Sequence, residues 1–323
     1  MNDRSSRLIK IGTRSSELAL RQARIVQIAL EEQGLECELV TFKTVGDKKL
    51  DEPLSAIGAK GLFTHELEVA LKKGKVDCCV HSLKDLPTEN PDELEIGAVL
   101  EREDPRDVLV VNSVTGADSL MTIPAGSRIG TSSLRRRAQL LTLRPDLEVA
   151  ELRGNVPTRL RKVDQGLVHA AILAAAGLIR LNAQQHIKQF LEPPDWLPAA
   201  GQGAIAVQIR TDDDEMRELL KPLHHTPTDI AVRAERAFLS ALEGGCQVPI
   251  GALTIYNPGG TATLFGFVSD LAGRDPVRGE GPVDLDAPED SGRALAADLR
   301  TRGATSLLME LRNSQQLISP QPE

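Results

Sequence analysis

The sequence predicts an α/β protein with more than one domain. In the N-terminal third, short apolar strands alternate with helical segments of about 12 residues, which is the pattern of an α/β sheet. The same alternation restarts after the segment EREDPRD, and the C-terminal third reads as a smaller α+β unit. A chain of 323 residues is also long enough for two or three domains of ordinary size.

In the first unit, apolar runs bounded by polar residues or glycine predict strands. These runs lie at residues 8–11, 36–42 and 76–83. A turn at residues 12–16 separates the first strand from a helix, and Gly34 ends that helix because glycine readily adopts the conformation of a helix C-terminus. A second helix is expected within residues 62–75, just before the third strand.

The second unit shows the same alternation, although no internal repeat is visible in the sequence. Its expected segments are VLVV, SRIGTSS, LEVAELRGN and HAAILAAAGLIRL. The stretch FLEPPDWLPAAGQGAIAVQIR then reads as a return connection that ends in a strand. In the third unit a helix begins with Thr226 as its N-cap and Pro227 at its first position, and Gly244-Gly245 ends it. The segments ATLFGFV and ATSLLMEL complete a small α+β domain.

The composition is that of a soluble globular protein, with 41% hydrophobic and 26% charged residues. Aromatic residues make up only 2%, so Leu, Val, Ile and Ala must fill the core. The N-terminal residues contain no apolar signal segment, and no stretch approaches the ~20 apolar residues of a membrane span. We therefore expect a cytoplasmic protein without a membrane partner. The net charge of −8 argues against broad affinity for nucleic acids.

The four cysteines show neither a CxxC pair nor the Cys/His spacing of a zinc site, so no metal is expected. Cys37, Cys78 and Cys79 lie in apolar, strand-like runs, where a reduced and buried thiol is the ordinary state. Cys246 differs because it lies in the loop EGGCQVPIG, where glycines permit close approach of another group. It is either a small turn residue or a point of covalent attachment, and no histidine in its loop could activate it as a nucleophile.

Residues 128–162 concentrate positive charge. They hold eight arginines and one lysine against three acidic residues, a local net charge of +6. Guanidinium groups match the geometry of carboxylates and phosphates, so this block favours a small ligand that carries several such groups. A nucleic acid would also supply negative charge, but its binding usually needs stacking aromatic residues, and the block contains no Phe, Tyr or Trp.

The helix expected at the start of this block places two arginines in its first turn. Leu134, Ala138 and Leu141 recur at helical spacing and are expected to face the core, which leaves Arg135 and Arg136 off that stripe. The helix dipole disfavours cations in the first turn. Either the arginines form a solvated face, or an anion binds there to the free N–H groups and nearby hydroxyls. These hydroxyls belong to Thr131, Ser132 and Ser133.

A second candidate site lies in HSLKDLP, at the end of the strand expected at 76–83. Ligands of α/β proteins bind at strand ends. Lys84 and Asp85 are either an ion pair on a surface turn or a functional pair, in which Lys84 holds an anion and Asp85 moves protons or stabilises a cation. A carboxylate repels the anion that the arginines attract, so its presence indicates positive charge on the substrate. His81 alone is expected to be a core residue.

Taken together and in order, these segments resemble the porphobilinogen deaminase family. They are IGTRSSELAL, TVGDKKLDEPL, GAKGLFTHELE, VHSLKDLP, GTSSLRRRAQL, LRGNVPTRL, AAGQGA and EGGCQVPIG. The joint occurrence of HSLKDLP, GTSSLRR, LRGN and GGCQVPIG makes the resemblance specific, and it spans nearly the whole chain. The chain departs from the family pattern in two small ways. Pro157 stands where the family has Gly, and His65 stands where it often has Lys.

The resemblance implies an enzyme that joins four porphobilinogen molecules head to tail with loss of ammonia. It then releases linear hydroxymethylbilane by adding water, for tetrapyrrole biosynthesis. The implied cofactor is a dipyrromethane made from two substrate units and held by a thioether to Cys246. The implied fold has two α/β lobes like those of periplasmic binding proteins and a smaller α+β domain. The expected boundaries are 1–104 with 203–222, then 105–202, then 223–323.

The resemblance also assigns roles to individual residues. The acetate and propionate groups of the pyrroles would be bound by Arg14, Ser16, Lys84, Thr131, Ser132, Ser133, Arg135, Arg136, Arg153, Arg159, Arg180 and Gln202. Asp85 would face the pyrrole N–H groups and stabilise the positive charge that forms on the substrate. The segment 46–61, with Lys60 and the adjacent Phe63, would be a mobile lid over the cleft.

Two other functions fit part of the sequence. A two-lobed anion receptor would account for the lobes but would leave the third domain and GGCQVPIG without a role. A nucleic-acid binder is disfavoured by the net charge and the scarcity of aromatic residues. The family resemblance further implies a monomer that binds porphobilinogen and the growing pyrrole chain, and that hands its product to the next enzyme.

Overall fold

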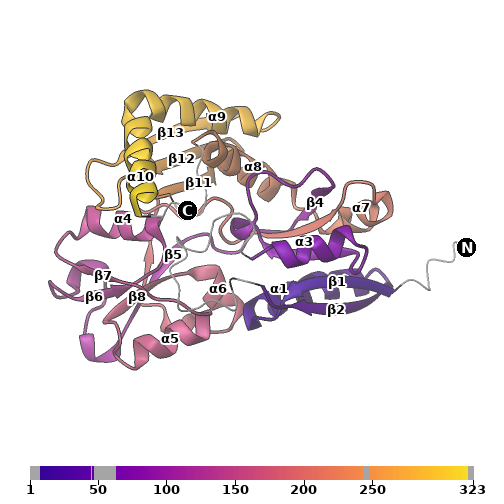
Figure 1. The fold of residues 1–323 in the computed structure, drawn as a ribbon, viewed down its shortest axis with the longest axis horizontal. Helices are drawn as coiled ribbons and strands as arrows, with labels where there is room; N and C mark the ends of the chain where they lie inside the picture. Colours follow the sequence, from indigo (N-terminus) through magenta and orange to yellow (C-terminus); the bar gives the residue numbers. More distant parts are fainter. Residues whose placement is uncertain (1–7, 45, 47–62, 243–247, 319–323) are drawn as a thin grey trace, which may run out of the picture.

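The computed structural model describes residues 8–44, 46, 63–242 and 248–318, and each of its three sheets forms the centre of one unit (Figure 1). In Figure 1 the first lobe is indigo to violet, except for its residues 205–220, which are salmon; the second lobe is magenta to pink, and the third unit is orange to yellow. The expected class, two α/β lobes and a smaller C-terminal α+β unit, is confirmed. The residue boundaries given above remain a prediction.

The first lobe contains a five-stranded sheet in the order β2-β1-β3-β10-β4. Its strands are β1 (Leu8–Arg14), β2 (Glu36–Phe42), β3 (Cys78–Ser82), β4 (Leu94–Val99) and β10 (Ile205–Arg210). Its helices are α1 (Glu17–Glu31), α3 (His65–Lys72) and α7 (Asp214–Leu220). β1 pairs in parallel with β2 and β3, while β10 runs antiparallel between β3 and β4. The carboxyl ends of β1 and β3, which precede the predicted site residues, therefore meet at one edge of the sheet.

The second lobe repeats this topology in the order β7-β6-β8-β5-β9. Its strands are β5 (Asp107–Val111), β6 (Arg128–Gly130), β7 (Glu148–Ala150), β8 (Ala170–Ala174) and β9 (Gln189–Leu191). Its helices are α4 (Leu134–Leu143), α5 (Val156–Asp164) and α6 (Ala175–Arg180). β6 is parallel to β7 and β8, and β5 runs antiparallel between β8 and β9. The two lobes thus share a topology that the sequence does not reveal as a repeat.

Two chain crossings join the lobes. Residues 100–106 lead from β4 into β5, which runs antiparallel between β8 and β9 in the second sheet. Residues 192–204 lead back from β9 into β10, which occupies the equivalent place in the first sheet. Each sheet is therefore completed by a strand that the chain reaches directly from the other lobe, so both crossings lie next to any site between the lobes.

The third unit is an antiparallel sheet covered by helices. Its strands are β11 (Ile250–Tyr256), β12 (Ala262–Val268) and β13 (Val277–Val283). Its helices are α8 (Thr226–Ala241), α9 (Pro288–Leu299) and α10 (Thr305–Ile318). Phe238 of α8 and Leu299 of α9 belong to its apolar core. Gly303, with φ of 114°, lies in the kink between α9 and α10, a backbone conformation that suits glycine.

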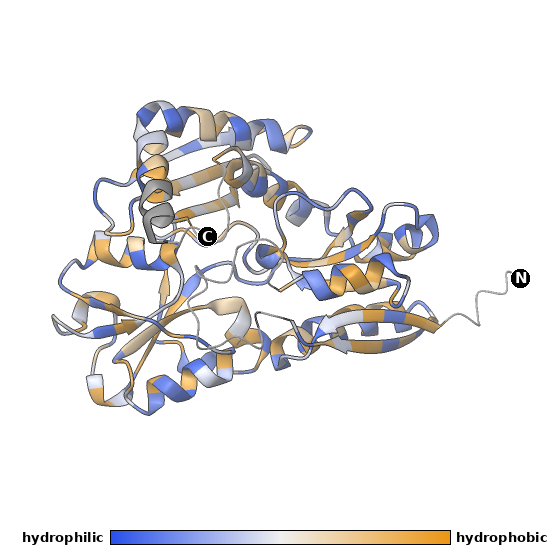
Figure 2. Ribbon diagram, in the orientation of Figure 1, coloured by the Kyte–Doolittle hydropathy of each residue, from blue (hydrophilic) through white to orange (hydrophobic). Residues whose placement is uncertain are grey.

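Aliphatic side chains dominate the buried core, as the composition predicts. Figure 2 shows hydrophobic residues on the strands and a mixture of hydrophobic and hydrophilic residues along the helices. In the first lobe, Ala23, Val26 and Leu30 of α1 pack on the sheet. In the part of the chain that the structure describes, no helix combines the length and the apolarity needed to span a bilayer.

Short helical turns complete the described structure. They are η2 (Leu83–Asp85), η3 (Ser113–Thr115), η4 (Leu120–Thr122), η5 (Gln184–His186), η6 (Lys221–Leu223) and the π-type turn η7 (Arg300–Ala304). Among them, η2 directly follows β3 and carries the Lys84-Asp85 pair. The prediction that this pair lies at a strand end is therefore confirmed.

Three expected boundaries differ from the structure. β1 continues through Arg14, so the residues assigned to a turn after position 11 are partly strand. α3 is shorter than predicted and begins at His65. The N-cap of α8 is His225 rather than Thr226, because the His225 side chain accepts a hydrogen bond from the backbone N–H of Thr228. Pro227 still lies in the first helical turn, where its missing N–H leaves no intrahelical bond unmade.

Candidate functional site

A cavity of about 90 Å³ opens between the two lobes. Of the residues predicted to bind the substrate, the cavity brings together Lys84, Arg136, Arg159, Arg180 and Gln202. They arrive from five places in the fold: η2, the start of α4, α5, the end of α6 and the second crossing. Four cations around one small cavity create a strong local preference for an anion.

Burial perturbs the cations of this cavity in a consistent direction. Burial, followed by the charge of Arg136, lowers the pKa of Lys84 to about 8. The same two causes lower the pKa of Arg159 to about 10, and burial lowers that of Arg180. A cation that is both desolvated and surrounded by like charge gains stability when a carboxylate binds beside it. The cavity is therefore electrostatically prepared for an acidic ligand.

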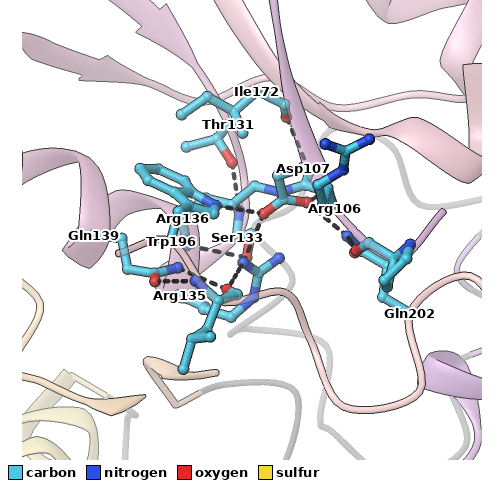
Figure 3. Close-up of polar contacts among 12 residues, drawn as sticks. Arg106, Asp107, Thr131, Ser133, Arg135, Arg136, Gln139, Ile172, Trp196 and Gln202 are labelled. Carbon is cyan, nitrogen blue, oxygen red and sulfur yellow. Dashed lines mark hydrogen bonds and ion pairs between the residues drawn. The ribbon is translucent and has the colours of Figure 1, made fainter. Parts of the chain in front are cut away.

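Behind this cavity lies Asp107, a fully buried carboxylate at the start of β5 (Figure 3). Its Oδ2 accepts hydrogen bonds from Arg135 at 2.7 Å and from the indole of Trp196 at 2.8 Å. Its Oδ1 accepts from Arg136 at 2.7 Å and from Gln202 at 2.8 Å. Burial alone would raise the pKa of Asp107, but the two guanidinium groups outweigh burial and hold it below its usual range.

The sequence analysis missed Asp107 and misassigned the faces of α4. Leu134 and Leu141 are only partly buried, whereas Arg135 and Arg136 are 5% exposed. The apolar-stripe prediction is confirmed for Ala138, which is fully buried, but it is wrong for the first turn of α4, where the inward face meets a carboxylate. Asp107 pairs with both arginines, so the protein itself compensates part of their charge, and the anionic ligand expected at this turn stays a prediction. The one signal for it is an acid that opens the otherwise apolar strand DVLVV.

The predicted hydroxyls serve the backbone around α4 and α1. Ser133 is the N-cap of α4 and accepts from the N–H of Arg136, and Thr131 accepts from the N–H of Ser133. Ser132 donates to the carbonyl of Leu152 at 2.8 Å. Ser16 caps α1 in the same way as Ser133 caps α4. These hydroxyls fix the two helix N-termini that face the cleft residues, and none of them lines the cavity.

Asp85 lines a second, smaller cavity of about 20 Å³. Arg14 and Phe63 line the same cavity, with the Arg14 guanidinium 4.3 Å from the centre of the Phe63 ring. Arg14 Nη1 lies 3.8 Å from Asp85 Oδ2, which is a long ion pair between two partly exposed side chains. Asp85 is thus oriented by a cation without being sealed from solvent, so it can still accept a proton or face a cationic group.

His81 and the thiols of the described residues fit a structural role. Burial lowers the pKa of His81 to about 4, so this imidazole is neutral at pH 7. Burial raises the pKa values of Cys78 and Cys79 well above the ordinary range, and that of the half-buried Cys37 to about 11. At neutral pH these three thiols are protonated and unreactive, as expected for core cysteines. Cys246 and Lys60 lie outside the described residues, as does most of the predicted lid.

Two family models cover most of the chain. Residues 9–218 match "porphobilinogen deaminase, dipyromethane cofactor binding domain", and residues 230–301 match "porphobilinogen deaminase, C-terminal domain". The chain belongs to the porphobilinogen deaminase family. Its relatives include porphobilinogen deaminases of Syntrophobacter fumaroxidans, 48% identical over 95% of this chain and 99% of the relative, and of Moorella thermoacetica, 53% identical over 94% and 96%.

Some solved structures outside the porphobilinogen deaminase family are also similar to this chain. A nutrient binding protein from Burkholderia cenocepacia bound to methionine has a TM-score of 0.42 at 16% identity, over 66% of this chain and 89% of that one. A methionine binding protein, MetQ, has a TM-score of 0.43 at 15% identity, over 73% and 94%.

The described residues fit the cofactor that the family description names. Nε of Arg136 and Nη1 of Arg153 are buried, and neither has a hydrogen-bond partner in the described part of the chain. Buried donors without partners are costly, and an acidic group bound between the lobes would satisfy them. A dipyrromethane carries acetate and propionate groups, which are ligands of the required charge and geometry.

Within this porphobilinogen deaminase chain, one buried ion pair ties the crossings to the third unit. Arg102, in the first crossing, forms two hydrogen bonds of 2.6 and 3.0 Å with Glu235 of α8, whose side chain is fully buried. Glu235 also accepts from the N–H of Gly201 in the second crossing and from that of Thr254 in β11. Both lobes and the third unit therefore meet at one carboxylate.

Proposed function

We propose that this chain joins four porphobilinogen molecules head to tail, releases ammonia at each condensation, and then frees linear hydroxymethylbilane by adding water. The observation that carries the proposal is the cavity between the lobes, where Lys84, Arg136, Arg159 and Arg180 place four cations around one small space. Its family membership supports the same activity. The site takes a substrate with several carboxylates and one amine.

The cations bind the acid side arms of the pyrroles. Among the described residues, Lys84 has one hydrogen bond, to Gln202 at 3.2 Å, so its other two donors can hold a carboxylate. Nε of Arg136 and Nη1 of Arg153 are further donors for this task. The complete proposed binding set is Arg14, Ser16, Lys84, Thr131, Ser132, Ser133, Arg135, Arg136, Arg153, Arg159, Arg180 and Gln202. Within it, Arg135 and the hydroxyls contribute by fixing the first turn of α4 and of α1, since other contacts already occupy them.

Cys246 holds the dipyrromethane cofactor through a thioether. The cofactor supplies the pyrrole end to which the first substrate is joined. No histidine stands beside this cysteine in sequence, and attachment requires only a thiol that becomes alkylated once, rather than a nucleophile that is regenerated at every turnover. Cys246 follows α8 in the sequence, and α8 contacts both crossings through Glu235.

Asp85 manages charge and protons on the substrate. Loss of ammonia from porphobilinogen leaves an electron-poor pyrrole, and bond formation then places positive charge on the ring that attacks it. A carboxylate beside the ring N–H stabilises that cation and accepts the proton that is lost when aromaticity returns. Arg14, 3.8 Å from Asp85, orients the carboxylate.

Intact-protein mass spectrometry tests the covalent part of the proposal. The wild type should exceed its sequence mass by two linked pyrrole units, and Cys246→Ala should lose that excess together with turnover. Cys37→Ala is the matched control and should keep both. An unmodified wild type that consumes porphobilinogen at full rate would refute the attachment. A wild type that binds porphobilinogen but never releases ammonia would favour a receptor instead.

Substitution of Asp85 tests the chemical part. Asp85→Asn should lose nearly all turnover while keeping the cofactor mass, because the amide neither accepts a proton nor stabilises a cation. Unchanged turnover would rule out this role. We further propose that the protein works as a monomer in the cytoplasm and hands hydroxymethylbilane to the next enzyme. Sedimentation of the loaded enzyme, with and without that product, tests the oligomeric state.

A further inference from the structure

Arg236 of α8 contacts the chain just after Asp85. Its Nη1 donates to the carbonyl of Leu86 at 3.3 Å, and its Nη2 donates to those of Pro87 at 2.7 Å and Thr88 at 3.2 Å. Three consecutive carbonyls that follow η2 therefore converge on one guanidinium from the third unit. These carbonyls come from the LPT segment that terminates the HSLKD motif.

This arginine has no counter-ion among the residues that the structure describes. Its recorded partners are the three carbonyls, and burial lowers its pKa to about 10. Burying a cation among neutral groups costs free energy, so a gain in stability does not explain this contact. A guanidinium is nevertheless suited to the geometry, because its planar fork spans several acceptors at once and an ammonium does not.

Apolar packing beside Arg236 reinforces the same contact. Val232 lies one helical turn earlier on α8, on the same face. Val232 packs in one buried cluster with Leu83 and Leu86, the residues that flank the Lys84-Asp85 pair. The turn that carries Asp85 is thus held from one side by an apolar contact and from its C-terminal side by the guanidinium.

We propose that Arg236 is a positioning residue that fixes the turn of Asp85 against α8 of the third unit. This contact, called the clamp below, holds the Asp85 carboxylate where it meets the substrate, so that each condensation finds it in the same position. This inference rests on the proposed role of Asp85.

The clamp predicts a loss of rate without a loss of binding. Displacing a reacting group by about 1 Å can lower the rate 100-fold. Of the cations that line the larger cavity, Lys84 shares the turn η2 with Asp85, but Arg136, Arg159 and Arg180 lie on other elements and keep binding the substrate. Arg236→Met should therefore lower kcat 10- to 100-fold, with KM for porphobilinogen within about 3-fold of wild type. Arg236→Lys keeps one donor group and should recover part of kcat.

The experiment compares Arg236→Met and Arg236→Lys with the wild type and with Arg233→Gln. Arg233 lies on the same helix, but its ion pairs reach Glu289 and Asp229 within the third unit. Each variant is purified with its cofactor mass verified, and ammonia release, kcat, KM and the unfolding midpoint are measured. We expect Arg233→Gln to keep wild-type kcat.

Two results would overturn the inference. One is wild-type kcat in cofactor-loaded Arg236→Met. The other is an equal loss of kcat in Arg233→Gln, which would show that general loosening of the third unit is the cause. If Arg236→Met does not fold, Arg236→Lys is the deciding variant. Wild-type kcat in Arg236→Lys would show that the fork geometry is irrelevant and would overturn the inference. A wild type without turnover would instead refute the proposed function.

Discussion

Replacing the buried carboxylate of Asp107 should destabilise the second lobe strongly. In Asp107→Asn, the amide presents one acceptor oxygen where the carboxylate presents two, so two of the four donors around this side chain lose their acceptor. The amide NH₂ would also face a guanidinium. Both arginines would remain buried, with 5% exposure, without the charge that compensates them.

The expected loss follows from the type of interaction that is broken. Removing one partner of a buried ion pair usually destabilises a protein by about 3–5 kcal/mol, because an uncompensated charge remains inside. Asp107 serves two such pairs, at 2.7 Å each, so we expect a value in the upper part of this range. Asp146→Asn is the control, since its pair with Arg144 lies at the surface and its loss should change little.

Urea unfolding followed by circular dichroism, at several pH values, measures the effect. The folded pKa of Asp107 lies below its unfolded value of about 3.9, so its stabilisation is present above pH ~4 and is lost as the pH falls further. As the pH falls below ~4, the wild type should therefore lose this part of its unfolding free energy. Asp107→Asn should not show this loss. A variant within about 1 kcal/mol of wild type at pH 7 would refute the reasoning.

Three other predictions follow from the described contacts. The pKa of Lys84 is about 8, so KM for porphobilinogen should rise as the pH increases through 8, and Lys84→Arg should flatten this rise because arginine stays charged. Glu235→Gln should lower the unfolding free energy by about 3 kcal/mol, because Arg102 stays buried without its counter-ion. A loss below about 1 kcal/mol would contradict the assigned charge compensation. Cys78 and Cys79 should resist iodoacetamide at pH 8 in the native protein, which peptide mass analysis checks.

Local patterns predicted the parts of the site that depend on local structure. The buried run that contains Cys78 and Cys79 ends where β3 ends, so the position of Lys84 and Asp85 at a strand end followed from the sequence. The placement of Arg135 and Arg136 in a first helical turn also followed, since a hydroxyl-rich segment precedes them. In both cases residues a few positions apart determine the result.

Contacts between segments that are far apart in the sequence could not be predicted from such patterns. Asp107 lies 28 positions before Arg135 and 89 before Trp196, and β5 reaches α4 only because it is inserted antiparallel beside β8. Periodicity treats a helix face as either apolar and buried or polar and exposed. In the first turn of α4 two arginines face inward, where a single acid satisfies them, and this breaks the assumption. The prediction that Leu134 faces the core was therefore wrong, although Ala138 of the same stripe is buried.

The position of Asp107 also explains how an arginine pair can be packed inside a lobe and still serve the cleft. Its carboxylate carries one negative charge against the two positive charges of Arg135 and Arg136. These three side chains together therefore keep a net positive charge beside the cavity. Gln202 links this carboxylate to Lys84, and Lys84 precedes Asp85 in the chain. Asp85 itself lines the other cavity, with Arg14 as its neighbour. Two acids near the same cations thus have separate tasks: the sealed one keeps the cations in place, and the open one is left to meet the substrate.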